Sequence, residues 1–151
     1  MRRWFALVIL TVVLGLLAAG VSAQPPWAPA HGKNQPAFQG YWMGVDPVDG
    51  GDARRSLVRL ENGRFALAAR DTVFTLCDGT EHGFGSFDDG VVVGRNVLQS
   101  DALTLQCFNV NASVVLRVRF ELVNNSLMNE ITTRQDGTPV STIVFHRVSQ
   151  E

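Results

Sequence analysis

The sequence has little of the chemistry on which many enzymes and nucleic-acid-binding proteins depend. It contains two cysteines, three histidines, one tyrosine and, against twelve arginines, a single lysine. Its formal net charge is -1, and the basic residues are scattered among acidic ones instead of forming a basic stripe. Such a chain lacks the electrostatic footprint for nucleic acid or an anionic membrane surface. We therefore expect neither as a partner of the mature protein.

Long apolar runs are absent except at the N-terminus. The chain starts Met-Arg-Arg, and residues 4–19 are almost wholly apolar. Val21-Ser22-Ala23 then places small residues where a signal peptidase reads them. Because the run is short for a membrane-spanning helix, we predict a signal peptide over 1–23 and a secreted or periplasmic location. The alternative is a retained membrane anchor.

Cysteines are few, and neither lies in a Cys-x-x-Cys motif. In an oxidising compartment Cys77 and Cys107 are expected to pair. The bond would close a loop of 31 residues, for which chain entropy gives roughly 3.5–4 kcal/mol; two buried free thiols are the alternative. His31, His82 and His146 are scattered, so we expect no metal site from these residues and no cofactor.

Helical periodicity is missing from the rest of the chain. Residues 24–37 contain four prolines, which predicts an extended leader. Over 38–151 polar and apolar residues alternate, with turn residues every 8 to 12 positions, which predicts one all-β domain. Sequential turns favour an up-and-down antiparallel β-barrel of 8–10 strands, whose closure removes exposed sheet edges. A β-sandwich is the alternative.

Two hairpins set the predicted register. Asn62-Gly63, read as a two-residue turn, pairs residues 58 and 60 with 67 and 65. Asn124-Asn125, read the same way, pairs residues 118 and 120 with 131 and 129, and places Glu130 beside Arg119 on the outer face. These registers predict an inward-facing, ligand-binding wall formed by Val58, Leu60, Phe65, Leu67, Leu116, Val118, Phe120, Asn129 and Ile131.

Among these, Asn129 is a polar exception that needs a partner, which could be Thr133, water or a ligand. Further turns are predicted at Asp88-Asp89-Gly90, at Gln99-Ser100-Asp101 and at Asp136-Gly137. The register of the last strand stays open. A slip of one residue decides whether Val144 and His146 or Ile143 and Phe145 face inward.

Gly40-Tyr41-Trp42, at the start of the first predicted strand, resembles the Gly-x-Trp signature of lipocalins and the wider calycin group, which includes the avidin type. In that family the tryptophan closes one end of the barrel, and an arginine of the last strand packs across it. The resemblance gives these structural roles to Trp42 and Arg147. No Thr-Asp-Tyr-like second motif is present. The alternative is that Trp42 is an ordinary core aromatic, with Gly40 and Gly44 allowing close packing.

The densest polar cluster contains Asp46, Asp49 and Asp52 at three-residue spacing. Carboxylates are the hard oxygen ligands that Ca²⁺ prefers, although this spacing does not match an EF-hand loop. The alternative is a hairpin loop in which the aspartates form side-chain turns and pair with Arg54 and Arg55.

Three functions remain open. The first is a barrel that binds a small, mostly apolar ligand without chemistry. The second is a protein-interaction module with a filled barrel, which could present an exposed stripe of Ile143 and Phe145. The third, a calycin-type enzyme, would need His82 or His146 inside a cavity, and the chain has no Gly-x-Ser-x-Gly motif. A cavity of ~300 Å³ or more would favour the binding barrel.

Overall fold

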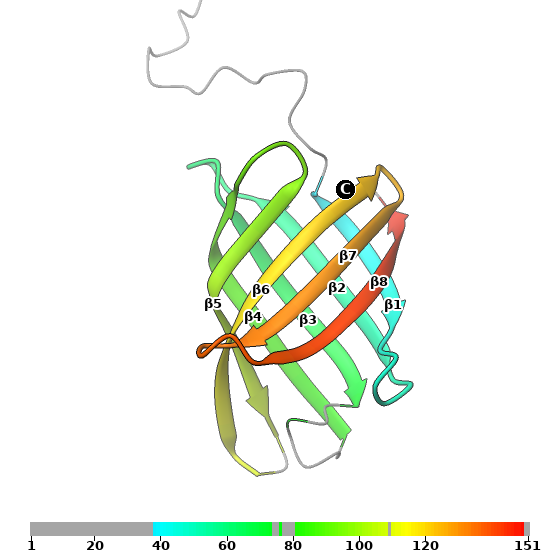
Figure 1. The fold of residues 1–151 in the computed structure, drawn as a ribbon, viewed down its shortest axis with the longest axis vertical. Coiled ribbons are helices and arrows are strands. Elements are labelled where there is room, and N and C mark those ends of the chain that lie inside the picture. Colours follow the sequence, from blue (N-terminus) through cyan, green and yellow to red (C-terminus); the bar gives the residue numbers. More distant parts are fainter. Residues whose placement is uncertain (1–37, 74–75, 77–80, 109, 150–151) are drawn as a thin grey trace, which may run out of the picture. The chain divides into compact units, whose positions relative to one another are not determined.

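The computed structural model describes residues 38–73, 76, 81–108 and 110–149. Eight antiparallel strands in chain order form one closed barrel, in which β8 returns to pair with β1 (Figure 1). The predicted up-and-down barrel is confirmed. The strands are β1 (Gly40–Val45), β2 (Asp52–Arg59), β3 (Phe65–Val73), β4 (Glu81–Val92), β5 (Val97–Cys107), β6 (Ala112–Asn124), β7 (Leu127–Arg134) and β8 (Pro139–Ser149).

Several predictions fall on residues outside this description. They are the signal peptide over 1–23, the leader over 24–37 and Cys77, which was predicted to form a disulfide with Cys107. Cys107 itself is buried on β5, close to Leu76. The disulfide therefore stays a prediction. Within the described part of the chain, no helix is long and apolar enough to cross a membrane.

The barrel wall follows the alternation in the sequence. On β6, Leu116, Val118 and Phe120 point inward and are buried, whereas Arg117 and Arg119 between them are exposed. Alternating side chains on opposite faces is the basic property of a strand, so one apolar residue in two is enough to fill one side of a sheet. Phe65 and Leu67 on β3 are inward and buried in the same way.

The first hairpin differs from the predicted register by one residue. The Leu60 amide donates to the Arg64 carbonyl at 2.8 Å, and the Gly63 amide donates to the Leu60 carbonyl at 3.0 Å. In this hairpin loop only Gly63 has a positive φ, of 80°, whereas a two-residue type I′ turn needs a positive φ at both central residues. The Asn62 side chain accepts a hydrogen bond from the Arg64 amide at 3.0 Å. The loop therefore has three residues, not two.

This slip moves part of the predicted wall to the outer face. Leu57 pairs with Leu67 in place of Val58, so Leu57 is buried and Val58 is 46% exposed on the outside of the barrel. Leu60 lies just beyond β2 in the hairpin and is half-buried. The prediction that Val58 and Leu60 face inward from β2 was wrong, because a one-residue slip exchanges the two faces of a strand.

The hairpin between β6 and β7 is shifted as well. Its turn is centred on Asn125-Ser126, and the Ser126 amide donates to the Asn124 side chain at 2.8 Å. An irregularity between Leu122 and Asn124 adds one residue to β6. Phe120 consequently pairs with Glu130 and Val118 with Thr132, which places both polar residues inside. The inward prediction for Asn129 and Ile131 was wrong: both are half-buried on the opposite face.

β4 and β5 are longer than the turn signals predicted. β4 runs through Asp88-Asp89-Gly90, and β5 runs through residues 99–101, so neither segment is a turn. Both strands are irregular there, and the Ser100 hydroxyl donates to the Asp89 carboxylate at 2.5 Å. The turn between these strands lies instead at residues 93–96, whereas the one predicted at Asp136-Gly137 is confirmed.

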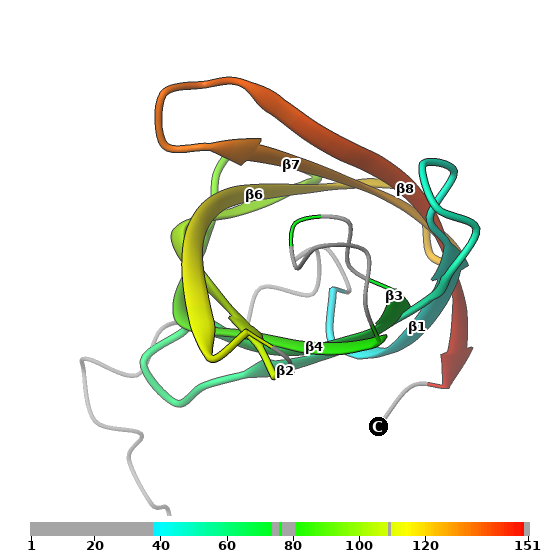
Figure 2. The same ribbon diagram turned by 90° about the horizontal axis from the view of Figure 1, so that it is seen from below.

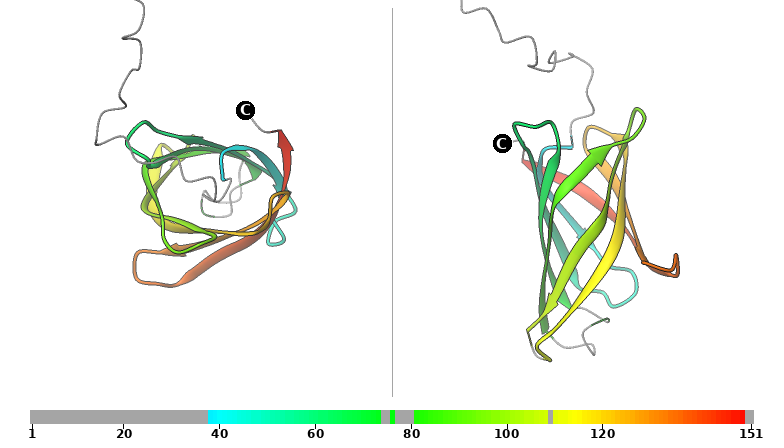
Figure 3. Two further views of the ribbon diagram at one scale, coloured as in Figure 1. Left: turned by 90° about the horizontal axis from the view of Figure 1, so that it is seen from above. Right: turned by 90° about the vertical axis from the view of Figure 1, so that its left-hand side faces the viewer.

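The interior is packed at one end of the barrel. Ile143 and Phe145 of β8 face inward and are fully buried, while Val144 and His146 are exposed, which settles the register left open by the sequence. This end is filled by large side chains that have almost no exposed surface, among them Phe38, Trp42, Leu57, Leu98, Phe120, Met128 and Phe145. Figure 2 looks along the barrel from the other end, and Figure 3 shows the ring of strands from the packed end.

Trp42 and Arg147 close the packed end together. The indole N–H of Trp42 donates to the Phe38 carbonyl at 2.9 Å, and the Arg147 guanidinium lies 4.1 Å above the indole ring. Arg147 also donates to the carbonyls of Asn125 and Gln39, at 2.6 and 2.5 Å. The contact that the lipocalin resemblance assigned to Arg147 is therefore present, and the single arginine joins β8, the start of β1 and the β6–β7 turn.

Two glycines allow this closure. Gly40 has a φ of 137°, a value that residues with a side chain rarely adopt. A Cβ at Gly44 would lie 2.5 Å from the Val144 carbonyl oxygen, so a side chain there would push β1 away from β8. The small residues near Trp42 are needed where the first and last strands meet.

Candidate functional site

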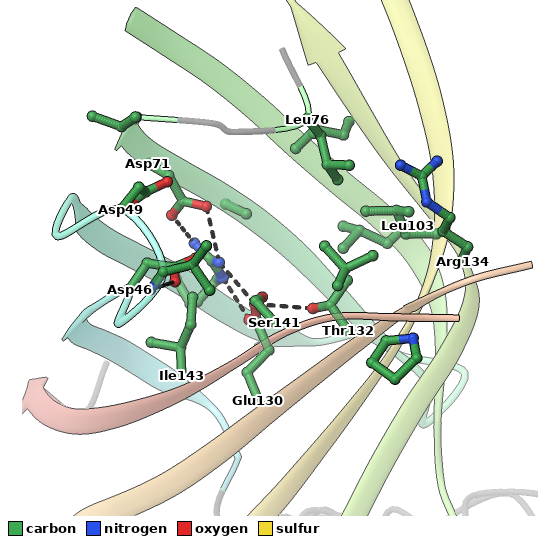
Figure 4. Close-up of a pocket in the computed structure, with 18 residues that line it drawn as sticks. Asp46, Asp49, Asp71, Leu76, Leu103, Glu130, Thr132, Arg134, Ser141 and Ile143 are labelled. Carbon is green, nitrogen blue, oxygen red and sulfur yellow. Dashed lines mark hydrogen bonds and ion pairs between the residues drawn. The ribbon is translucent and has the colours of Figure 1, made fainter. Parts of the chain in front are cut away.

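The end opposite Trp42 holds a cavity of about 200 Å³ (Figure 4). Its walls come from the β1–β2 loop and from strands β2, β3, β5, β6, β7 and β8. Most of the lining residues are apolar, and these are Val48, Ala69, Val73, Leu76, Leu103, Leu105, Leu116, Pro139, Val140 and Ile143. The barrel is therefore packed in one half and hollow in the other.

A buried ion network forms the polar side of this cavity. Arg55 projects inward from β2 with only 3% of its surface exposed, and it forms ion pairs with Asp71 of β3 and Glu130 of β7. Both carboxylates are labelled in Figure 4. Its Nε donates to Glu130 Oε2 at 2.6 Å, and its Nη2 donates to Glu130 Oε1 at 2.8 Å and to Asp71 Oδ2 at 3.1 Å. Nη1 donates to Asp71 Oδ1 and to the Arg54 carbonyl. All five guanidinium N–H groups are thus used.

The hydrocarbon core supports the network from the packed side. The Arg55 guanidinium carbon lies 4.9 Å from the centre of the Phe145 ring, a cation–π contact that suits a desolvated arginine. The Thr132 hydroxyl donates to Glu130 Oε1 at 3.4 Å. The network is therefore fixed from several directions, which keeps its carboxylate oxygens at defined positions in the cavity wall.

Charge in the cavity is not balanced. The residues that line it include four carboxylates, on Asp46, Asp49, Asp71 and Glu130, but only two arginines, Arg55 and the exposed Arg134. If every group is ionised, the lining carries a formal charge of -2. A single buried arginine that already pairs with two carboxylates leaves an excess of negative charge on the polar side of the cavity.

Burial and this excess charge alter the ionisation of the network. Burial by itself would lower the pKa of Arg55, but its pairing with Glu130 and Asp71 outweighs burial and raises that pKa. The pKa of Asp71 is raised, first by burial and then by the nearby Glu130 charge, against the lowering effect of Arg55. Burial also raises the pKa of Asp46. Protons are therefore bound more readily at Asp71 and Asp46 than at exposed aspartates.

The raised pKa of Asp71 gives a pH dependence of known sign. Because the folded protein binds the Asp71 proton more tightly than the unfolded chain does, protonation of Asp71 stabilises the fold. This contribution is complete at pH values below the pKa of an aspartate in the unfolded chain. It is lost as the pH rises through the higher pKa that Asp71 has in the folded protein. We expect the free energy of unfolding of the wild type, minus that of Asp71→Asn, to decrease between pH 4 and pH 7. Urea unfolding at four pH values measures this difference. A difference that grows with pH would show that Arg55 stabilises the Asp71 carboxylate more than burial opposes it.

The structure separates the predicted wall into residues that reach the cavity and residues that do not. Of the predicted wall residues, Leu116 lines it, whereas Phe65, Leu67, Val118 and Phe120 are inward and buried in the core cluster. The polar residues Arg55 and Glu130 were missed as parts of a site. Inward positions of β2 and β7 would have included Arg55 and Glu130 had the hairpin registers been correct.

The aspartate cluster forms turns. The Val48 amide donates to Asp46 Oδ1 at 2.8 Å, and the Gly51 amide donates to Asp49 Oδ1 at 2.9 Å, as in the side-chain turns considered as the alternative. Asp52 lies 4.0 Å from Arg54, whereas Arg55 pairs elsewhere. Across the ranges that the structure describes, no group of three or more His, Cys, Asp or Glu could hold a metal ion.

Neither histidine that an enzyme would require can be placed in the cavity. His146 is exposed on the outer face of β8. His82 lies on β4, and its side chain is outside the described part of the structure. The cavity lining as described contains carboxylates, arginines and hydroxyls but no imidazole.

The fold and the closed end are those that the lipocalin resemblance implies: eight antiparallel strands in a closed barrel, with a tryptophan at one end under an arginine of the last strand. No model of a known protein family matches the chain, and no curated protein matches it.

Proposed function

We propose that the protein is a secreted or periplasmic, calycin-like barrel that binds a small, mostly apolar molecule and does not transform it. The observation that carries this proposal is the cavity at the end of the barrel opposite Trp42, with aliphatic walls and one buried polar side. Pockets of this kind, apolar with a few fixed polar groups, are typical of small-molecule sites in the mouths of β-barrels.

Volume limits the ligand. The cavity of about 200 Å³ is smaller than the ~300 Å³ set above as support for a binding barrel. The ligand must accordingly be smaller than a drug-sized molecule, or extend from the mouth into solvent. A short aliphatic chain with a single polar group matches both the volume and the aliphatic walls.

The polar side of the cavity favours a ligand that donates hydrogen bonds. Every N–H of Arg55 is already bound to protein oxygen atoms, so this arginine has no donor left for an anion. Asp71 and Glu130 keep unused acceptor lone pairs, since a carboxylate offers about four. A neutral hydroxyl or a protonated amine would satisfy these acceptors, and the amine would also offset their surplus charge. A ligand carboxylate would be repelled.

Native mass spectrometry of the processed protein, purified without denaturation from its own compartment, is the first test. A retained small adduct that is lost on unfolding supports the proposal and gives the ligand mass. A clean protein mass favours the second candidate, a protein-interaction module. That candidate no longer includes a stripe of Ile143 and Phe145, because both side chains are buried.

A matched set of probes tests the ligand class directly. Hexylamine, hexanol and hexanoate share one alkyl chain and differ in the head group. We expect hexylamine to bind most tightly and hexanoate least, with the largest methyl chemical-shift changes at Leu103, Leu116 and Ile143, which line the cavity. Tightest binding of hexanoate, or no change at these methyl groups with any probe, would contradict the proposal.

Occluding the mouth supplies the matched control. Ser141→Trp introduces an indole at a residue that lines the cavity, whereas Val144→Trp introduces an indole on the exposed outer face of the same strand. We expect binding of hexylamine to fall about tenfold or more in Ser141→Trp and to be unchanged in Val144→Trp. Equal affinities in the two folded variants would place the binding site elsewhere.

A further inference from the structure

A second hollow lies on the outer wall of the barrel, across β1, β2, β3 and β4. Its volume is about 210 Å³, and it is lined by Tyr41, Arg54, Ser56, Ala68, Ala69, Arg70 and Phe84. Ala69 is buried and also lines the interior cavity, whereas the other six residues do not. We call these six residues the arginine groove.

The strand register explains the hollow. Tyr41, Ser56 and Ala68 lie side by side in one row across β1, β2 and β3. Ser56 and Ala68 are small and Tyr41 is large, so the row forms a low floor with a wall at the β1 side. A hollow on the face of a sheet needs adjacent small residues such as Ser56 and Ala68, since larger side chains would cover the backbone evenly.

The next row supplies the charge. Arg54 pairs with Arg70, and Arg70 pairs with Phe84, across β2, β3 and β4. Directly opposite like charges in an antiparallel pair are destabilising, because their Cβ atoms lie only ~5 Å apart. Two arginines here therefore act against the stability of the sheet, and an anion between them would relieve that repulsion.

The two arginines are poorly neutralised by protein groups. The carboxylate of Asp52 reaches Arg54 at 4.0 Å, and both side chains are about half exposed. Arg70 forms no ion pair with another described residue, and Arg54 Nε is buried without a hydrogen-bond partner among the described residues. Other outer arginines contrast with them: Arg119 donates to Glu121 at 2.7 Å.

We propose that the arginine groove binds a small aromatic carboxylate. Paired guanidinium groups hold a carboxylate by several charge-assisted hydrogen bonds, and 42% of the Arg54 side chain is exposed at the groove. The rings of Tyr41 and Phe84 at the borders of the groove offer flat apolar surfaces to an aromatic body. The groove therefore favours an anion, whereas the polar side of the interior cavity favours a hydrogen-bond donor or a cation.

Phenylacetate, with benzylamine and inorganic phosphate as comparison probes, tests this site at low ionic strength. We expect saturable binding of phenylacetate that shifts the Arg54 Nε–Hε resonance and the Ala68 methyl resonance, and leaves the Leu103 and Ile143 methyl resonances unchanged. Arg70→Gln is expected to weaken binding about tenfold or more, while Arg119→Gln, on the outer face of β6, is expected to leave it unchanged.

Several results would overturn the proposal. They are binding of phosphate as tight as that of phenylacetate, equal loss of affinity in Arg70→Gln and Arg119→Gln, or shifts confined to the interior methyl groups. If Arg70→Gln is poorly folded, Tyr41→Leu supplies a second test. This variant keeps both arginines but removes one aromatic ring, and its affinity for phenylacetate must fall.

Discussion

Arg55→Leu is expected to lower the free energy of unfolding by about 3–5 kcal/mol, because removing one partner of a buried ion pair leaves the other charge uncompensated. Here the change would leave two carboxylates, Asp71 and Glu130, facing each other in the barrel interior. Small domains have only ~5–15 kcal/mol of stability, so a large fraction of the molecules could unfold. Urea unfolding followed by tryptophan fluorescence measures the change.

The neighbouring residue is the control. Arg54→Leu removes the same charge and similar bulk from the outer face of β2, where the side chain is partly exposed, and should cost less than about 1 kcal/mol. A triple variant with Arg55→Leu, Asp71→Leu and Glu130→Met should recover most of the loss, because apolar residues of similar volume can replace a buried ion network. A cost of Arg55→Leu as small as that of Arg54→Leu would contradict the buried network.

Trp42→Ala is the second variant with a large expected effect, a loss of about 3–5 kcal/mol, as for other large buried aromatic residues replaced by alanine. The Trp42 side chain has no exposed surface. The substitution would leave a cavity at the packed end, remove the hydrogen bond to the Phe38 carbonyl and remove the ring beneath Arg147. Thermal and urea unfolding followed by circular dichroism measure the loss.

Two matched variants separate these contributions. Tyr41→Ala truncates the adjacent aromatic residue, which lies on the outer face of the same strand, and should cost about 1 kcal/mol or less. Trp42→Phe keeps an aromatic ring beside Arg147 but lacks the indole N–H, so its loss should fall between those of the wild type and Trp42→Ala. Equal stability of Trp42→Ala and Tyr41→Ala would show that the closed end does not depend on the indole.

The architecture could be predicted from the sequence because it depends on period and turn spacing, which are local. Residues such as Leu116, Val118 and Phe120 alternate with arginines whatever the exact pairing is. An up-and-down barrel also has the simplest possible topology, in which every strand pairs with its neighbours in the chain. The contact of Arg147 with Trp42 could be predicted only through the family resemblance.

The registers could not be predicted from turn residues alone. Asn62-Gly63 fits a two-residue turn, but it also fits a three-residue loop in which only the glycine has a positive φ. At Asn124-Asn125-Ser126 any of several turns is possible, and the observed one needs an extra residue at Val123. An error of one position is small along the chain. It nevertheless made us predict Asn129 and Ile131 as inward-facing, whereas Glu130 between them faces inward.

The polar side of the cavity was missed for the same reason and for one more. Arg55 and Glu130 are separated by 75 positions in the chain, so no local pattern joins them. An inward arginine is nevertheless unusual, and it requires carboxylates at inward positions of other strands. With the correct registers, Glu130 and Asp71 would have been obvious partners.

Closure of the barrel depends on residues at opposite ends of the chain. Trp42 on β1 is paired with Arg147 on β8, a separation of 105 positions, and β8 also contributes Ile143 and Phe145 to the core. Contacts this distant in sequence slow folding, because the long chain between them must be ordered first. If the protein is exported through a channel with its N-terminus first, as the proposed location implies, one edge of β1 stays unpaired until β8 has followed. The barrel would then close only after export.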